Sequence, residues 1–164
     1  MVNYLEKYGY YPKTSEIDGA IANISANVDG FMTEDVLKAC FSMLDLTSLK
    51  TDDTEASIAA LVEKVNSFRA DYPEWPYPAS VCVYPNFAST VRDTRKGDFH
   101  ITVVSACFPS SQSFLDVKLL ECAKTVEDGA DEVDIVLALN SFLAGDYEKA
   151  SEEIRAVRKC IDEV

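Results

Sequence analysis

Residues 132–138, with the sequence EVDIVLA, form a short apolar run that carries a carboxylate in its middle. Aliphatic and β-branched residues in runs of this length predict buried strands. Three similar runs precede it, at residues 42–47, 80–84 and 100–107. Amphipathic segments, which predict helices, lie between or after these runs, at residues 53–69, 113–128 and 146–162. Strands that alternate with helices at roughly 30-residue spacing predict a parallel sheet of the α/β class.

The sequence also predicts where the long helices begin and which face each one buries. Helix 53–69 is expected to be capped by Thr51 or Asp52, and helix 113–128 to begin with a capping box at Ser113 and to end at Gly129. The side chains expected to point inward are, along the chain, Ile58, Leu61, Val62, Val65 and Phe68; Val117, Leu120, Ala123 and Val126; and Ala150, Ile154, Val157 and Ile161.

Four βα units fit either a doubly wound sheet or the first half of a TIM-type (β/α)8 barrel, and periodicity alone leaves both open. A nucleotide-binding Rossmann unit is disfavoured, because no glycine-rich turn follows the first strand. Residues 1–40 lack this strand–helix rhythm and predict two short helices, the first with a capping-box sequence at Ser15. We expect 1–40 to be an N-terminal helical extension that serves only packing, and 41–164 to hold the four βα units.

Composition and charge exclude several function classes. The 164 residues carry 15 Lys and Arg against 28 Asp and Glu, a net charge of −13 that repels nucleic acid and anionic membranes. No apolar run reaches the roughly 18 to 20 residues of a membrane helix, and the first residues lack the order of a signal peptide. Five cysteines without metal-ligand spacing predict reduced thiols, no metal site and a cytoplasmic protein.

Polar residues in the predicted strands mark the candidate site. A parallel strand is covered on both faces and is normally apolar throughout, so Asp45, Thr47 and Asp134 are expected to face the interior of a barrel. A buried carboxylate needs a partner or a function, and a backbone amide or a buried lysine would explain these two equally well. Cys82 is either a buried structural thiol or part of a pocket, and His100 is a weak catalytic candidate.

Four segments in this order resemble the deoxyribose-phosphate aldolase family. They are Leu44-Asp45-Leu46-Thr47-Ser48-Leu49, Val81-Cys82-Val83-Tyr84-Pro85-Asn86-Phe87, Phe108-Pro109-Ser110-Ser111-Gln112 and Gly129-Ala130-Asp131-Glu132-Val133-Asp134-Ile135-Val136. The Asp45-Leu46-Thr47 segment and the Gly129–Asp134 segment are each moderately specific, and all four segments in this order are strongly so. The chain departs from the family pattern at Ala106-Cys107, where a small or polar pair usually precedes Phe-Pro.

The resemblance implies a (β/α)8 barrel that cleaves 2-deoxy-D-ribose 5-phosphate to D-glyceraldehyde 3-phosphate and acetaldehyde. The family forms a Schiff base between a lysine and the substrate and needs no metal or cofactor. By resemblance, Asp134 is the catalytic aspartate that moves protons, and Asp45 supports the lysine network. Thr47 and Cys82 line the pocket, and Phe108 lies in the loop after the third strand.

The resemblance further implies that the Schiff-base lysine, a second lysine and the phosphate-binding loops lie on later strands than these four. We therefore expect the chain to be an N-terminal portion of an aldolase, inactive alone, whose complete enzyme takes a small phosphorylated sugar and no nucleic acid or membrane. A second hypothesis is a catalytically silent half-barrel that acts as an assembly or folding module. Open strand edges in a half-barrel favour a homo-oligomer under either hypothesis.

Overall fold

The computed structural model describes residues 4–11 and 13–162. The described residues divide into two compact units, with the boundary between residues 39 and 40. Within the first unit, α1 spans Tyr4–Lys7, α2 Thr14–Ala26 and α3 Val28–Phe31, and α4, Glu34–Phe41, runs into the second unit. Helix α2 begins one residue before Ser15, and its N-cap, Lys13, makes no side-chain capping bond, so the expected capping box is wrong. No described helix is long and apolar enough to cross a membrane.

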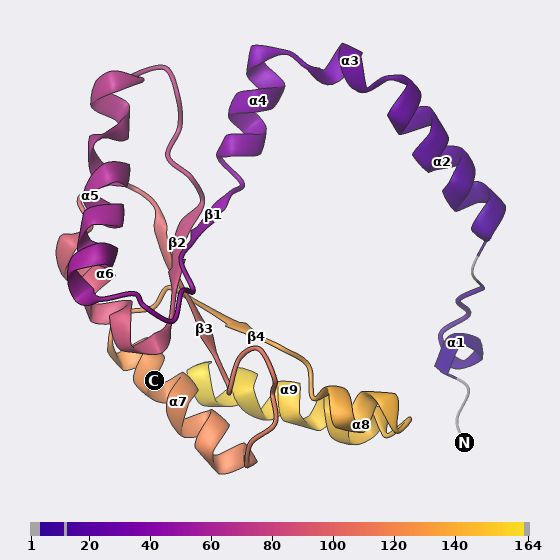
Figure 1. Ribbon diagram of the computed structural model, residues 1–164. Helices are drawn as coiled ribbons and strands as arrows, with labels where there is room; N and C mark the ends of the chain where they lie inside the picture. The colour runs from indigo at the N-terminus through magenta and orange to yellow at the C-terminus, as the bar shows by residue number, and fades with distance from the viewer. Residues whose placement is uncertain (1–3, 12, 163–164) are drawn as a thin grey trace. The chain divides into compact units, whose positions relative to one another are not determined.

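The second unit is built on a four-stranded parallel sheet (Figure 1). Its strands are β1 Asp45–Thr47, β2 Ser80–Val83, β3 His100–Ser105 and β4 Glu132–Ile135, in the spatial order β1-β2-β3-β4. In a doubly wound sheet, the order in which successive strands are added reverses at a switch point. In a barrel, each strand is added beside the previous one. The sequential order is therefore that of a partial TIM-type barrel, which confirms the predicted fold class.

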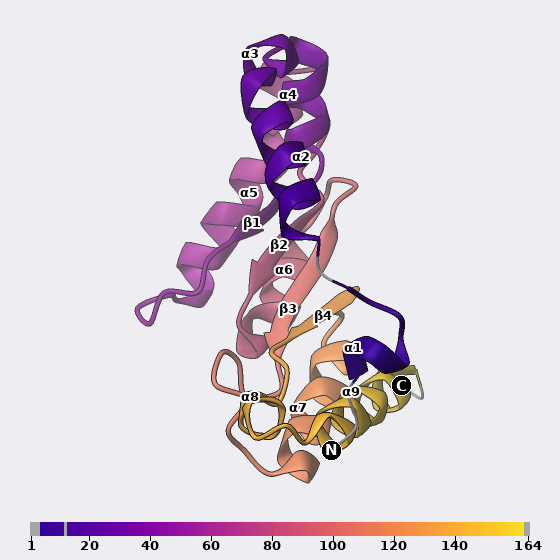
Figure 2. The same ribbon diagram turned by 90° about the vertical axis from the view of Figure 1, so that its right-hand side faces the viewer.

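Helices follow each strand and pack on one face of the sheet (Figure 2). They are α5 Glu55–Asp71, the 3-10 turn η1 Pro85–Phe87, α6 Ala88–Thr94, α7 Leu115–Glu127, α8 Leu139–Leu143 and α9 Tyr147–Asp162. The main core lies between β2, β3 and the helices α5 and α6, and includes Val81, Val83, Ile101, Val103, Ile58, Val62 and Val91. A smaller cluster joins α7 and α9 around Cys122 and Val157.

The strands and caps differ from expectation in detail. β1 and β4 are shorter than predicted, because residues 42–44 form a turn after α4 and the chain enters α8 soon after β4. Thr54, rather than Thr51 or Asp52, caps α5: its side chain accepts from Ser57 N, and the Ser57 side chain accepts from Thr54 N. Gly129 has the positive φ of 105° expected of a helix stop.

The buried face of α7 is the clearest error of the sequence reasoning. Val117 and Leu120 are 50% and 57% exposed, whereas Lys118, Cys122 and Thr125 are buried. The inward face is rotated by one residue because Lys118 is buried in a polar network described below. The predicted face of α5 is correct at Ile58, Val62 and Val65, but on α9 Ile154 is 45% exposed.

Candidate functional site

The face of the sheet opposite the helices collects the predicted site residues. The register pairs Asp45 with Ser80, Thr47 with Cys82 and Val104 with Asp134. Paired residues in neighbouring parallel strands project to the same face, and so do residues two apart in one strand. Asp45, Thr47, Cys82 and Asp134 therefore share one face across the sheet, as the sequence predicted.

Hydrogen bonds fix two of these groups. Ser80 Oγ donates to Asp45 Oδ1 at 2.7 Å, and Thr47 Oγ1 donates to the Asp45 carbonyl oxygen at 3.0 Å. Asp45 is thus held by a neighbouring hydroxyl, a partner that the sequence reasoning did not consider.

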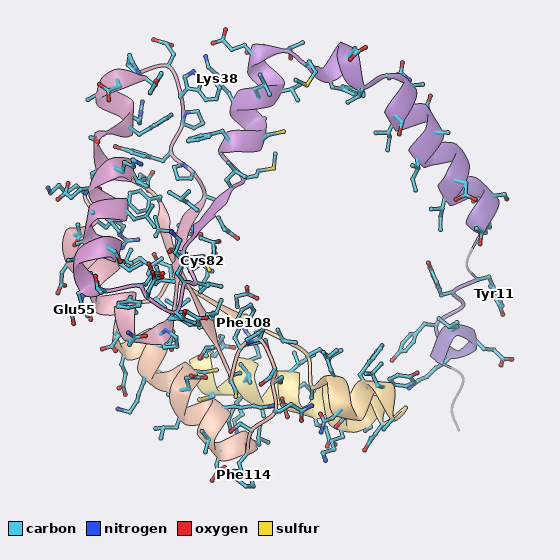
Figure 3. The ribbon with its side chains drawn as sticks, viewed as in Figure 1. Tyr11, Lys38, Glu55, Cys82, Phe108 and Phe114 are labelled. Atoms are coloured by element: carbon cyan, nitrogen blue, oxygen red, sulfur yellow. The ribbon has the colours of Figure 1, made fainter. Side chains whose placement is uncertain are left out.

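Cys82 lies at the centre of this face and is 4% exposed (Figure 3). Burial raises the pKa of the Cys82 thiol, a hydrogen bond with the Thr47 side chain lowers it, and the charges of Asp134 and Asp45 raise it further. The thiol is therefore protonated at neutral pH and acts as a small apolar side chain between two carboxylates. The pKa of Cys82 on β2 therefore depends on the charges of Asp45 on β1 and Asp134 on β4.

Asp45, Thr47 and Asp134 are exposed, whereas we expected the two carboxylates to be buried. The expectation was wrong because the described helices pack on the opposite face, so water solvates the carboxylates. Exposure removes the desolvation cost that the sequence argument had used. The face is an open, acidic surface that can bind and exchange protons with a small molecule once a cover excludes water.

Phe108 is half-buried in the loop between β3 and α7, beyond the end of β3 (Figure 3). The loop places three non-glycine residues in the left-handed region, Ala106 at φ 55°, Cys107 at φ 61° and Ser111 at φ 54°. Such conformations are strained and persist only when the surroundings hold them. Here the Cys107 N–H donates to Glu121 Oε2 at 2.7 Å, which anchors the unusual Ala106-Cys107 pair to α7.

The second anchor of this loop is a buried ion pair that sequence reasoning missed. Lys118 on α7 is 2% exposed, and its Nζ donates to Ser111 Oγ at 2.9 Å and to Glu153 Oε1 of α9 at 2.5 Å. The available signal was a lysine flanked by apolar residues in an amphipathic helix, with acidic residues on the next helix. The network connects α7, α9 and the loop that carries Phe108.

A second polar network lies on the same sheet face as Cys82 and Asp134, at the N-terminal end of the strands, because Cys82 pairs with Thr102 and Thr102 pairs with Glu132. Glu132 Oε1 is 2.8 Å from His100 Nδ1, and Thr102 Oγ1 donates to Glu132 Oε2 at 2.7 Å. The hydrogen bond to Glu132 raises the pKa of His100. His100 is therefore part of a link between β3 and β4, away from the loops that follow the strands.

Within the described residues, no group of three His, Cys, Asp or Glu side chains is arranged to hold a metal ion. The described strand residues on the acidic face offer carboxylates, hydroxyls, a thiol and the imidazole of His100, and none of them is a lysine. Its chemistry is therefore that of proton transfer and polar contact.

A family model described as DeoC/LacD family aldolase matches residues 40–164. The chain belongs to this aldolase family. It is 34% identical over 119 residues to a deoxyribose-phosphate aldolase from Agrobacterium fabrum, covering 72% of this chain and 44% of the relative. It is 35% identical over 139 residues to human deoxyribose-phosphate aldolase, covering 78% of this chain and 43% of that protein.

A solved aldolase, QR15, shares the fold with a TM-score of 0.65 and 26% identity, covering 73% of this chain and 50% of that structure. The chain thus spans about half the length of the curated aldolases it matches. The four parallel strands of this chain therefore form part of a TIM-type barrel like that of the solved aldolase.

Proposed function

We propose that the chain contributes the first half of an aldolase barrel that cleaves 2-deoxy-D-ribose 5-phosphate to D-glyceraldehyde 3-phosphate and acetaldehyde. The observation that carries the proposal is the position of Asp134 on the same sheet face as Asp45, Thr47 and Cys82, in a chain of the aldolase family.

In this reaction, a lysine amine condenses with the substrate carbonyl, water leaves, and the iminium accepts the electron pair of the breaking C–C bond. The role we assign to Asp134 is to transfer protons at the reacting carbons, through water, as the bond breaks. Asp45, fixed by Ser80, orients the polar network, while Thr47 and Cys82 shape the pocket wall and Phe108 forms part of its rim.

No lysine shares the acidic face, so we propose that the Schiff-base lysine is absent from these 164 residues and that they have no turnover alone. Incubation with deoxyribose 5-phosphate and borohydride tests this, because hydride reduces any iminium to a stable secondary amine. We expect the protein mass to stay unchanged. Stoichiometric trapping on any lysine of the chain would disprove the proposed absence.

The assigned reaction can be tested by complementation. The part of the Agrobacterium fabrum relative that lies C-terminal to the matched region would supply the remaining strands. We expect the two polypeptides together, and neither alone, to release acetaldehyde from deoxyribose 5-phosphate. A folded complex that binds without turnover would favour the silent half-barrel instead.

Within that complex, Asp134→Asn should lower the turnover number by about 10²–10⁴-fold, the usual loss for an acid–base group. Glu127→Gln, at an exposed position of α7, is the matched control and should leave turnover unchanged. Near-full activity of the Asp134 variant would remove its catalytic assignment.

A further inference from the structure

The loop between β3 and α7 borders the part of the sheet that carries Asp134. Val104, the register partner of Asp134, is the last residue but one of β3, and the loop begins at Ala106. Active sites of TIM-type barrels lie at the C-terminal ends of the strands, on the loops that follow them. The loop is therefore placed where it can form part of the wall around Asp134.

The backbone of this loop forms a strained turn around Phe108. The Ser111 N–H donates to the Cys107 carbonyl oxygen at 2.9 Å, which closes a turn over residues 107–111. Cys107 and Ser111 both lie in the left-handed region, with φ of 61° and 54°. Glycine adopts such angles freely, whereas a residue with a side chain needs support from its surroundings. Strained backbone of this kind is concentrated at functional sites.

One face of α7 supplies the support at both ends of the turn. Glu121 Oε2 accepts the N–H of Cys107 at 2.7 Å. Lys118 Nζ donates to Ser111 Oγ at 2.9 Å. Residues three apart lie on the same face of a helix, so the two side chains reach the loop together. A carboxylate and an ammonium thus hold the first and the last residue of the turn, on either side of Phe108.

Helix α9, which lies beside α7 (Figure 1), completes the support at Ser111. Glu153 Oε1 is the ion-pair partner of Lys118, and it also accepts from Ser111 Oγ at 3.5 Å, so the three groups form a closed triangle. Ser111 is 3% exposed, and its hydroxyl both donates and accepts inside the protein. An apolar contact would join the two helices without the desolvation cost of a buried ion pair. What the charged triangle adds is a direct hold on the loop.

We infer that Lys118 and Glu121 are positioning residues that fix Phe108 at the rim of the substrate pocket before the substrate binds. The inference rests on the proposed function, because it takes Phe108 as part of that pocket. Lys118 is 2% exposed and Glu121 is half-buried, so both act through the loop rather than on the substrate. A loop that is already ordered loses less conformational entropy on binding, so this hold increases the affinity for a small phosphorylated sugar.

Hydrogen–deuterium exchange of the 164-residue chain tests the hold on the loop. Ser111→Ala removes the Lys118 contact and leaves the ion pair with Glu153 in place. We expect the amides of residues 106–112 to exchange at least about tenfold faster, the usual effect of losing a hydrogen bond to a charged group. Ser113→Ala is the matched control, because Ser113 is exposed and its hydroxyl bonds to none of the described residues. Exchange of β2, in the main core, shows that each variant is folded.

The other end of the turn gives an independent pair of variants. Glu121→Leu removes the acceptor of the Cys107 N–H, whereas Glu121→Gln keeps a side-chain oxygen that can accept it. We expect fast exchange of the loop with leucine and exchange close to that of the unsubstituted chain with glutamine. The inference is overturned if the unsubstituted loop exchanges as fast as unprotected backbone. It is also overturned if Ser111→Ala and Glu121→Leu leave the exchange of the loop unchanged.

Kinetics of the complex with the C-terminal part of the Agrobacterium fabrum relative connect the loop to the reaction. Ser111→Ala should raise KM for deoxyribose 5-phosphate by about 3- to 10-fold and leave kcat nearly unchanged, because a pocket rim binds substrate and transition state alike. Asp134→Asn should instead lower kcat. An unchanged KM in a Ser111→Ala complex whose loop exchanges fast would overturn the positioning role. An unsubstituted complex without turnover would contradict the proposed function, and the exchange results would still decide whether α7 holds the loop.

Discussion

Lys118 of α7 and Glu153 of α9 form an ion pair with Nζ and Oε1 2.5 Å apart, and the lysine side chain is only 2% exposed. The same amine donates to Ser111 Oγ, at a loop position with φ of 54°. One buried charge therefore connects two helices and holds a strained loop. A buried pair adds little net stability, but it restricts the packing to arrangements in which both charges are satisfied.

Removing one partner should be costly. Glu153→Leu leaves the buried Lys118 amine without its counter-charge, and we expect a loss of roughly 3–5 kcal/mol in the free energy of unfolding. The double variant Lys118→Met, Glu153→Leu should recover most of that loss. Urea denaturation at fixed protein concentration measures both, with Lys124→Met, an exposed lysine of α7, as the control. A single variant that loses under 1 kcal/mol would show that the pair is solvated.

The start of α5 gives a second prediction. Thr54→Ala removes the acceptor for the Ser57 N–H and should cost about 1 kcal/mol of stability. Thr51→Ala alters the residue that the sequence first suggested as the cap and should change stability by less than about 0.5 kcal/mol. Equal losses from the two substitutions would contradict the observed cap.

These cases show where sequence reasoning succeeds and where it stops. Strand and helix positions follow from period and composition, and the shared face of Asp45 and Asp134 follows from alternation along strands. The cap of α5 was misplaced by two or three residues because Thr51, Asp52 and Thr54 all have capping side chains, and only the backbone path selects among them.

The face of α7 was misjudged for a different reason. Apolar periodicity assigns lysine to water, and the partner that allows Lys118 to be buried lies 35 residues later, on another helix. The exposure of Asp45 and Asp134 could not be predicted either, because a sequence does not show what covers the second face of a sheet. Long-range partners decide both cases.

Cys82 should be a slow nucleophile. Its burial and the nearby carboxylates raise the thiol pKa, so little thiolate forms at pH 7.5. We expect iodoacetamide to alkylate Cys40, which is exposed, well before Cys82, as peptide mass spectrometry would measure. Asp134→Asn removes one source of the raised pKa and should speed Cys82 alkylation. Glu127→Gln, which lies away from this face, should leave the rate of Cys82 alkylation unchanged. An unchanged rate in the Asp134→Asn variant would show that Asp134 does not influence the Cys82 thiol.

The single histidine gives the sharpest test of the β3–β4 link. The hydrogen bond with Glu132 raises the pKa of His100 above 6.5. The hydrogen bonds that the Glu132 carboxylate accepts from the side chains of His100 and Thr102 lower the pKa of Glu132 below 4.5. A raised histidine pKa stabilises the fold below pH 6.5, and this contribution disappears as pH rises through the folded-state pKa of His100. The lowered pKa of Glu132 stabilises the fold above pH 4.5, and its contribution disappears as pH falls through the folded-state pKa of Glu132.

The pair is therefore most favourable between the folded-state pKa of Glu132 and that of His100, and it is weak because both side chains are largely exposed. One imidazole signal in a proton NMR titration reports the His100 pKa directly. Glu132→Gln should return that pKa toward 6.5, and added salt should lower it in the unsubstituted chain. Asp98→Asn, an exposed carboxylate near the same end of β3, is the control and should have the smaller effect. A His100 pKa that Glu132→Gln leaves in place would mean that the two side chains are not paired in solution.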